Sequence, residues 1–418
     1  MVCTSNERAG HSMNEPRLGR LRGPGHDASH VEPIELFYDV VYVLAVTQLP
    51  RHLLDDLSLR GAIETLILLL AVWAAWIHIA WLTNYLDPRE RVMRVLLLAL
   101  MLVSLVMSAS LLEAFDGYGL AFGGALSASL LIGQTYGLIA LWGRDPIGMV
   151  FERVLIWWVP VSALLVAGGL MDGSARLVAW GVAILVMYVV TATGFPLPRL
   201  GHAMTTDYPI SGEHFAHRCY LFITIALGET ILVIGTQFAR LPRDAPTMGA
   251  FVLAFLGSAG LWWLYFDRDA EAGIGAISAA ADPGRLGLWA YTFFHVPLVA
   301  GVIVSAAAFE LTLAHPDSEV DVATACLMLG GAALFFFGLA LFELEISRAS
   351  VVPPLIAIGG LAALTPVATV ATNLGLLAAT TAVIAVASMS LTMGRRIVVE
   401  SGARDGEGTD EVTSRVGS

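Results

Sequence analysis

Lysine is absent from the 418 residues, and all 23 basic residues are arginines. Charged residues make up only 14% of the chain against 57% hydrophobic residues, and the mean hydropathy is +0.74. This composition excludes a soluble globular enzyme and a disordered protein. The 35 acidic residues leave a net charge of -12 without any basic block, which argues against nucleic acid as a partner.

The chain is also poor in cysteine and lacks the motifs of soluble catalysis. Cys3, Cys219 and Cys326 are an odd number without C-x-x-C spacing, so neither a disulfide framework nor a cysteine zinc site is expected. There is no P-loop, nucleophile elbow, Rossmann glycine pattern or kinase signature. We therefore expect no cofactor, and we place any chemistry inside a membrane bundle.

Apolar stretches of bilayer-spanning length follow one another after residue 33, each closed by Pro, Gly, Asp or Arg. A span needs about 20 such residues. We predict twelve transmembrane helices, of which the first is the most polar; the last two can also be interpreted as one long helix, which would make eleven. The predicted spans are 34–51, 61–86, 92–115, 118–142, 150–171, 175–195, 214–238, 247–267, 286–314, 321–343, 351–371 and 374–394.

The arginines predict the orientation, because arginine in short loops is retained on the cytoplasmic side. With the N-terminus inside, 18 arginines fall in cytoplasmic tails and loops or in the adjoining cytoplasmic ends of spans, and five fall on the opposite face, whose 315–321 loop is acidic instead. Both termini are then cytoplasmic, which requires an even number of spans and favours twelve. Residues 1–31 lack a signal-peptide core, and they and residues 396–418 have the composition of disordered tails.

The two halves of the chain resemble each other at charged positions. The matched positions are Glu32 with Glu213, Gln48 with Glu229, 85–87 with 265–267, and 108–113 with 305–310. The segments 108–113 and 305–310 are further apart in sequence than the other matched positions. An insertion in the second half, at 269–284, would account for this larger separation. We predict an all-α membrane protein of two six-helix repeats, 32–200 and 201–395, in the same orientation about an axis along the membrane normal. Chance similarity between apolar helices is the alternative.

The first span carries charges that a membrane admits only when they are paired or solvated. Glu32, Glu35, Asp39 and Tyr42 follow a three-to-four-residue spacing, which puts them on one stripe of one helix. Like charges on such a stripe repel unless they bind a cation, pair with arginine or hold a proton. The alternative is that Glu32 and Glu35 lie in water at the positive end of the helix.

The seventh span holds Arg218 and Glu229, 11 residues apart, which share a helix face but are separated by about 16 Å of rise. Each therefore needs a partner on another helix. The first span offers Glu35 or Asp39 for Arg218, and we predict this ion pair across the repeat boundary. Glu229 follows Gly228, where a missing side chain would let another helix approach; a protonated, hydrogen-bonded Glu229 is the plainer alternative.

Three histidines, His78, His214 and His295, are lesser candidates. His295 stands two residues before Pro297. A proline within a span leaves one backbone carbonyl without its helical hydrogen bond, which occurs at transporter binding sites but also in helices where the kink is only structural. His214 and His217 have a spacing that a shared metal would allow, but no H-E-x-x-H motif or carboxylate cluster accompanies them, so we expect no metal. The tryptophans are expected to be belt or packing residues.

Residues 32–39 (Glu-Pro-Ile-Glu-Leu-Phe-Tyr-Asp), 214–218 (His-Phe-Ala-His-Arg) and 227–232 (Leu-Gly-Glu-Thr-Ile-Leu) resemble the bacterial low temperature requirement protein A family. The resemblance extends from about residue 30 to about 395. It departs at His217, where the family pattern usually has an acidic residue before the arginine. The resemblance implies a multi-pass protein of the bacterial inner membrane, without an agreed substrate or reaction.

Three functions fit these residues. The leading hypothesis is a secondary transporter of a small solute, of which an anion is one option. Transport would be coupled to protons or Na⁺ through intramembrane carboxylates. The second is an intramembrane enzyme acting on a lipid or isoprenoid, and the third is a sensor or assembly factor in which buried charges only fix helix pairing. The residues expected to bind or couple are Glu35, Asp39, Arg218, Glu229, Asp267 and Glu310. A solvated cavity shared by Asp39, Arg218 and Glu229 would favour the first two functions, and separate dry contacts the third.

Overall fold

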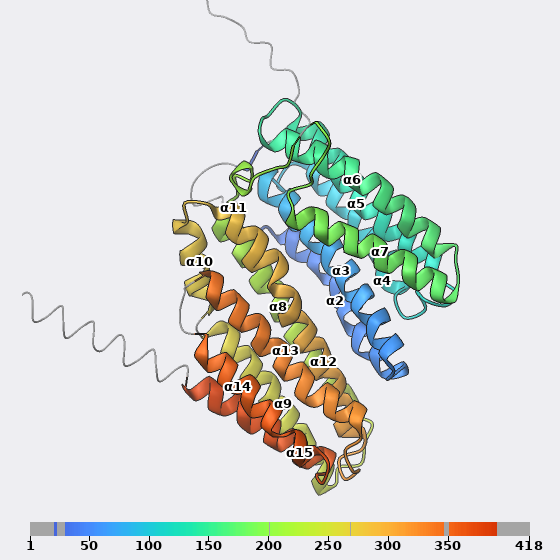
Figure 1. Cartoon of the computed structure of the whole chain (residues 1–418), viewed down its shortest axis with the longest axis vertical. Helices are drawn as coiled ribbons and strands as arrows, with labels where there is room; N and C mark the ends of the chain where they lie inside the picture. Colours follow the sequence, from blue (N-terminus) through green and yellow to red (C-terminus); the bar gives the residue numbers. More distant parts are fainter. Residues whose placement is uncertain (1–20, 23–29, 200, 268, 347–350, 391–418) are drawn as a thin grey trace, which may run out of the picture.

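The computed structural model describes residues 21–22, 30–199, 201–267, 269–346 and 351–390 (Figure 1). Within these ranges the backbone is helical, and β-structure is limited to isolated bridges. The tail expected at 396–418 lies outside the described residues, as does most of the tail expected at 1–31. The all-α fold class is confirmed.

The helices closely follow the apolar stretches of the sequence. In chain order they are α2 (Pro33–Asp55), α3 (Leu59–Tyr85), α4 (Arg91–Ala109), α5 (Gly119–Leu141), α6 (Ile147–Gly169), α7 (Gly173–Ala192), η1 (Thr205–Asp207), α8 (Gly212–Phe238), α9 (Ala245–Phe266), α10 (Asp269–Ala279), α11 (Pro283–Leu286), η2 (Gly287–Phe293), α12 (His295–Ala314), α13 (Val322–Ile346), α14 (Val352–Ala363) and α15 (Thr365–Ala368). A last helix covers Asn373–Ser390.

Helix starts use local signals that the sequence carries. Pro33 occupies the first turn of α2, where its missing N–H costs no hydrogen bond. Ser58 caps α3 by accepting from the N–H of Gly61 at 3.2 Å. Asp244 caps α9 in the same way. These caps set where each apolar stretch enters the bundle.

Ten helices in the described part of the chain are long and apolar enough to cross a membrane. The predicted first and eleventh spans are not among them. The helix over the first, α2, has 23 residues but carries Glu35 and Asp39. The eleventh is the shorter apolar stretch Val352–Ala368. The alternative of one long helix over 351–394 is wrong, because α15 ends at Ala368 and the chain turns before Asn373.

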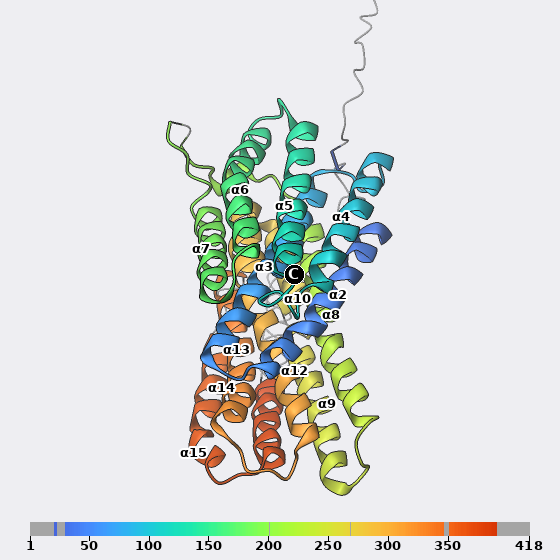
Figure 2. The same ribbon diagram turned by 90° about the vertical axis from the view of Figure 1, so that its right-hand side faces the viewer.

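Two groups of helices meet along one seam. Figures 1 and 2 show α4–α7 gathered at one end of the molecule and α9 with α13–α15 at the other. Between them, α2 and α3 of the first group pack against α8 and α12 of the second. The segment 269–284, expected as an insertion, contains α10, which packs on α8, α9 and α13.

The ninth span is interrupted near its start. Residues Gly287–Phe293 form a π-helix between α11 and α12, and Phe294 donates its N–H to the carbonyl of Trp289, five residues back, at 2.9 Å. Pro297 follows in α12 and has no N–H to return to the preceding turn. A π-bulge of this kind often marks a functional position in a helix.

Candidate functional site

The first helices of the two groups, α2 and α8, run side by side in the same direction. Arg218 of α8 contacts Asp39 of α2 with 2.7 Å between Nη2 and Oδ1, and further along both helices Thr47 donates to Glu229 at 2.6 Å. The two residues of each contact are 179 and 182 positions apart in the sequence, so a later residue of α2 contacts a later residue of α8. Only parallel helices give nearly constant separations, and α2 therefore accompanies α8 through the bundle.

Arg218 lies at the centre of a buried ion network on this seam. Its Nη1 donates to Glu35 Oε1 at 2.9 Å and to the hydroxyl of Thr83 at 3.1 Å, while its Nη2 donates to Asp39 Oδ1 at 2.7 Å. The side chains of Glu35, Asp39 and Arg218 are all 0% exposed. The predicted interhelical pair is confirmed, with both proposed partners rather than one. The alternative that places Glu35 in water is wrong.

A second arginine enters the network from the N-terminal segment. Arg22 donates from Nη2 to Glu35 Oε2 at 3.0 Å, from Nε to the carbonyl of Thr83 at 3.1 Å and from Nη1 to the carbonyl of His30 at 2.9 Å. Its backbone N–H bonds the carbonyl of Tyr85 at the end of α3. Sequence reasoning missed Arg22, because it is one of four arginines in a polar segment without periodicity.

His214 is held in one tautomer by its neighbours. The amide nitrogen of Asn84 lies 2.9 Å from the carbonyl oxygen of Ser211 and 3.1 Å from Nδ1 of His214, and the Asn84 oxygen accepts from the Ser211 N–H at 2.8 Å. The amide therefore donates to Nδ1, which leaves the ring proton on Nε2. Nε2 lies 3.0 Å from Glu35 Oε1 and donates to it. His214 is thus a neutral donor that orients Glu35.

Trp76 closes the network on the side of α3. Its indole N–H donates to Asp39 Oδ1 at 2.7 Å, and the Arg218 guanidinium carbon lies 5.7 Å from the Trp76 ring centroid. A buried tryptophan of this kind packs through its ring and also donates a hydrogen bond from its indole N–H. Asp39 Oδ2 and Arg218 Nε are buried without a hydrogen-bond partner among the described residues.

The charges of the network balance. Two arginines face two carboxylates, and His214 is neutral, so the cluster carries no net charge. Burial of unbalanced charge is costly, whereas a paired and hydrogen-bonded set is tolerated. The stripe of carboxylates on the first span is therefore neutralised by arginine; no bound cation is needed for charge balance. The arrangement joins α2, α3, α8 and Arg22 through hydrogen bonds and ion pairs.

Glu229 lies apart, further along the same seam. It is 2% exposed, and its carboxylate accepts from Thr47. Glu310 of α12 hydrogen-bonds Gln237 and is close enough to Glu229 for their charges to interact. The expected close approach of a helix at Gly228 is wrong, because open space surrounds the position of its missing side chain.

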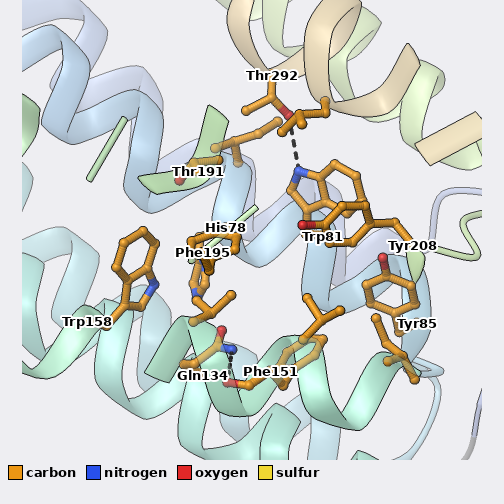
Figure 3. Close-up of a pocket in the computed structure, with 15 residues that line it drawn as sticks. His78, Trp81, Tyr85, Gln134, Phe151, Trp158, Thr191, Phe195, Tyr208 and Thr292 are labelled. Atoms are coloured by element: carbon orange, nitrogen blue, oxygen red, sulfur yellow. Dashed lines mark hydrogen bonds between the residues drawn. The ribbon is translucent and has the colours of Figure 1, made fainter. Parts of the chain in front are cut away.

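The remaining candidates lie outside the network. His295 is a core residue whose Nδ1 donates to the carbonyl of Ala290 at 2.8 Å and whose Nε2 accepts from Tyr265 at 2.8 Å. Asp267 follows the last turn of α9. His78 lines an aromatic cavity in the first group of helices (Figure 3). Among the described residues no group of three or more His, Cys, Asp or Glu is placed to hold a metal.

Asp39, Arg218 and Glu229 do not meet in one cavity. The first two are fully buried in direct contact, Glu229 has a separate partner, and none of the three lines the aromatic cavity. The buried charges form direct contacts at two separate levels of the α2–α8 seam.

The fold and this seam of buried charges define the class: an all-helical, multi-pass membrane protein. The chain matches the family described as bacterial low temperature requirement A protein (LtrA) over residues 30–389, and it belongs to that family. It is also similar to an uncharacterised protein, RA0937, of Rhizobium meliloti (strain 1021), with 35% identity over 329 residues, covering 78% of this chain and 80% of that protein. No solved structure matches the chain.

Proposed function

We propose that this protein is a secondary transporter of the bacterial inner membrane in which the Arg218 network is a gate. The proposal combines twelve spans, two six-helix repeats of like orientation and two cytoplasmic termini. The observation that carries it is the charge-balanced, fully buried network that joins the first helix of each half at the same end of the seam.

The neighbour relations of the helices support the duplication. In the first half α2 packs on α3 and α4, α4 on α5, and α5 on α6. In the second half α8 packs on α9 and α12, α12 on α13, and α13 on α14. The parallel course of α2 and α8 also fits halves related by an axis along the membrane normal.

Contacts between loops support twelve spans. Asn373, at the start of the last helix, donates to the carbonyl of His315 at 2.8 Å, and the N–H of Val320 bonds the carbonyl of Ala371. The end of α15 thus meets the loop where α12 ends and α13 begins. Because α14 follows the opposite end of α13, the stretch Val352–Ala368 returns across the bundle. The first helix, α2, crosses beside α8.

The network has the properties of a gate. A buried ion pair is weak evidence for stability, and its best-attested roles are in register and switching. Protonation of Asp39 on its unpaired Oδ2 would remove one negative charge and leave the cluster with a net positive charge. Arg218 would then lose an ionic partner, and the contact between α2 and α8 would weaken at that end. Glu229 and Glu310 would form a second site of proton or Na⁺ coupling, nearer the other end of the α2–α8 seam than the Arg218 network.

The test is solute-driven proton movement in liposomes that contain a pH-sensitive dye and the purified full-length protein. Neutral and anionic metabolite panels are added to wild type, Asp39→Asn, Glu229→Gln and the control Asp172→Asn, whose carboxylate is exposed. We expect a solute-dependent pH change with wild type and the control, and its loss with the other two. Equal signals from all four proteins would overturn the coupling assignment.

A second candidate function is favoured by the complete burial of Glu35, Asp39 and Arg218 in direct contact with one another. If the charges only fix helix pairing, the protein is a membrane sensor or assembly factor. That function predicts no solute-dependent proton movement from wild type at all, together with unchanged activity in the cell for every charge variant that folds.

A further inference from the structure

A cavity beside the first group of helices has polar atoms that no group in the described part of the chain satisfies. It encloses about 90 Å³ between α3, α5, α6, the segment before α8 and the π-helix η2. Its walls are aromatic and aliphatic, and the ring faces are set by contacts such as that between Trp158 and Phe195, with centroids 5.7 Å apart. Figure 3 shows the open space between these side chains.

Three buried polar groups at this cavity lack partners. The indole nitrogen of Trp158 and the hydroxyls of Tyr85 and Tyr208 have no hydrogen bond within the described chain, and the three side chains are 3%, 6% and 7% exposed. Trp158 lies across the cavity from both tyrosines (Figure 3). A buried polar group without a hydrogen bond is unfavourable, so an occupant that accepts hydrogen bonds from these groups would be stabilised.

The polar groups define the chemistry of an occupant. Indole N–H is a donor only, and a phenol can donate or accept. Burial raises the pKa of Tyr208 to about 12, so its hydroxyl keeps its proton at neutral pH. Among the described residues, no Arg, Asp or Glu lines the cavity. A charged occupant would have no ion-pair partner in these walls, whereas a neutral molecule with acceptor oxygens at both ends would pair with both sides.

The size and shape of the cavity limit the occupant further. A cavity of about 150 Å³ accepts benzene. This cavity has a volume of about 90 Å³, so a single ring fits only if the side chains around it move outward. Flat aromatic walls favour a flat ring. The neighbouring polar residue Gln134 already has a partner, because it donates to the carbonyl of Phe151 at 2.8 Å.

We propose that this cavity binds a small, uncharged, planar ring compound with oxygen acceptors, through Trp158 on one side and Tyr85 and Tyr208 on the other. The ring is either a free metabolite or the head group of a membrane lipid. This proposal is independent of transport, because the cavity and the Arg218 network share no residue.

The experiment is equilibrium dialysis of the full-length protein in detergent micelles, with empty micelles as the blank. The probe is 4-hydroxybenzaldehyde at pH 6, where it is neutral; 4-hydroxybenzoate adds a charge, and p-xylene lacks the oxygens. We expect saturable binding of the aldehyde alone. Trp158→Phe and Tyr208→Phe should each weaken it roughly two- to tenfold, the range of one hydrogen bond.

The matched control is Trp157→Phe. Trp157 is the chain neighbour of Trp158, but its indole donates to the carbonyl of Pro196 at 3.0 Å and it does not line the cavity. This variant should bind the aldehyde like wild type. Absence of saturable binding, equal effects of the two tryptophan variants, or binding of p-xylene as tight as that of the aldehyde would each overturn the proposal.

Organic extraction of the purified protein followed by mass spectrometry separates the two sources. A ring compound with an isoprenoid or acyl tail, displaced by the aldehyde, identifies a lipid head group. A ring without a tail, also displaced, identifies a free metabolite. A co-purified ring compound that the aldehyde does not displace would contradict a shared site.

Discussion

Arg218 connects more of the interior than its single charge indicates. It bonds carboxylates on two turns of α2 and a hydroxyl on α3, and it lies against the ring of Trp76. The planar guanidinium is suited to such a site, because its donors diverge in a fixed fork. Lysine, with one compact charge, would not reach both carboxylates in the same geometry.

Loss of Arg218 should therefore destabilise the protein strongly. Arg218→Gln leaves Asp39 as a buried charge without an ionic partner, and we expect a loss of about 3–5 kcal/mol. The double variant Arg218→Gln with Asp39→Asn should lose less than the sum of the two single variants, because it removes both charges. The measurement is the free energy of unfolding in detergent micelles.

The control for this cycle is Arg243→Gln. Arg243 is exposed in the loop between α8 and α9, and a surface change of this kind should stay within about 0.5 kcal/mol. Strict additivity of the two single variants at positions 39 and 218 would show that their side chains do not interact.

At the scale of the element, α13 depends on an aspartate that precedes it. Asp321 accepts a hydrogen bond from the N–H of Thr324 at 2.6 Å, and this bond holds the pKa of its carboxyl below the usual range. A group whose pKa is lowered on folding contributes stability above its ordinary pKa. That contribution is complete at neutral pH and is lost as the pH falls below about 4.

Asp321→Ala should cost about 1 kcal/mol at pH 7, the usual cost of losing such a cap, and less at pH 3. Asp321→Asn keeps an acceptor oxygen and should retain most of the stability at both values. Thermal unfolding in detergent at the two pH values measures this difference. An alanine variant equally destabilised at pH 3 and pH 7 would contradict the role of the carboxylate.

The π-helix η2 depends on a side chain from another helix. Trp73 of α3 donates its indole N–H to the carbonyl of Thr292 at 2.8 Å, which satisfies a backbone group in the interrupted region. Trp73→Phe would leave that carbonyl buried without this donor, at a cost of about 1–3 kcal/mol. Trp142→Phe, at a side chain that is 71% exposed, should change the free energy of unfolding little. Equal losses in the two variants would contradict this role of Trp73.

At the scale of the whole molecule, the proposed topology places the loop before α13 on the face opposite the termini. Cys3→Ser together with Cys326→Ser leaves Cys219, which is buried, and this double variant provides a suitable background. In that background Ser318→Cys should react with a membrane-impermeant maleimide added to intact cells with a permeable outer membrane. A fluorescent protein fused after residue 418 should fold and fluoresce in the cytoplasm.

Labelling of Ser318→Cys only after cell lysis would contradict this orientation. Arg144→Cys, at a loop that the arginine distribution places inside, is the matched control and should react only after lysis. If both positions reacted in intact cells, the span count between them would be wrong.

The hydrophobic sequence alone determined that this is a helical membrane protein. In a bilayer, an apolar stretch of spanning length pairs its own backbone N–H and C=O groups by forming a helix. Ten of those stretches have the length and composition of spans in the structure. The pairing of Arg218 with the first span was also predictable. A buried guanidinium needs a partner on another helix, and few spans carry a carboxylate.

Only the tertiary structure decided which groups complete the network. Arg22 comes from a segment without periodicity, Asn84 fixes the tautomer of His214, and Trp76 was expected as a belt or packing residue. The sequence also did not predict that Trp158, Tyr85 and Tyr208 would have polar atoms without partners in the described chain around the aromatic cavity. Helical periodicity states which residues share a face of one helix, but the partners of that face depend on how separate helices dock, and a linear pattern does not encode that contact.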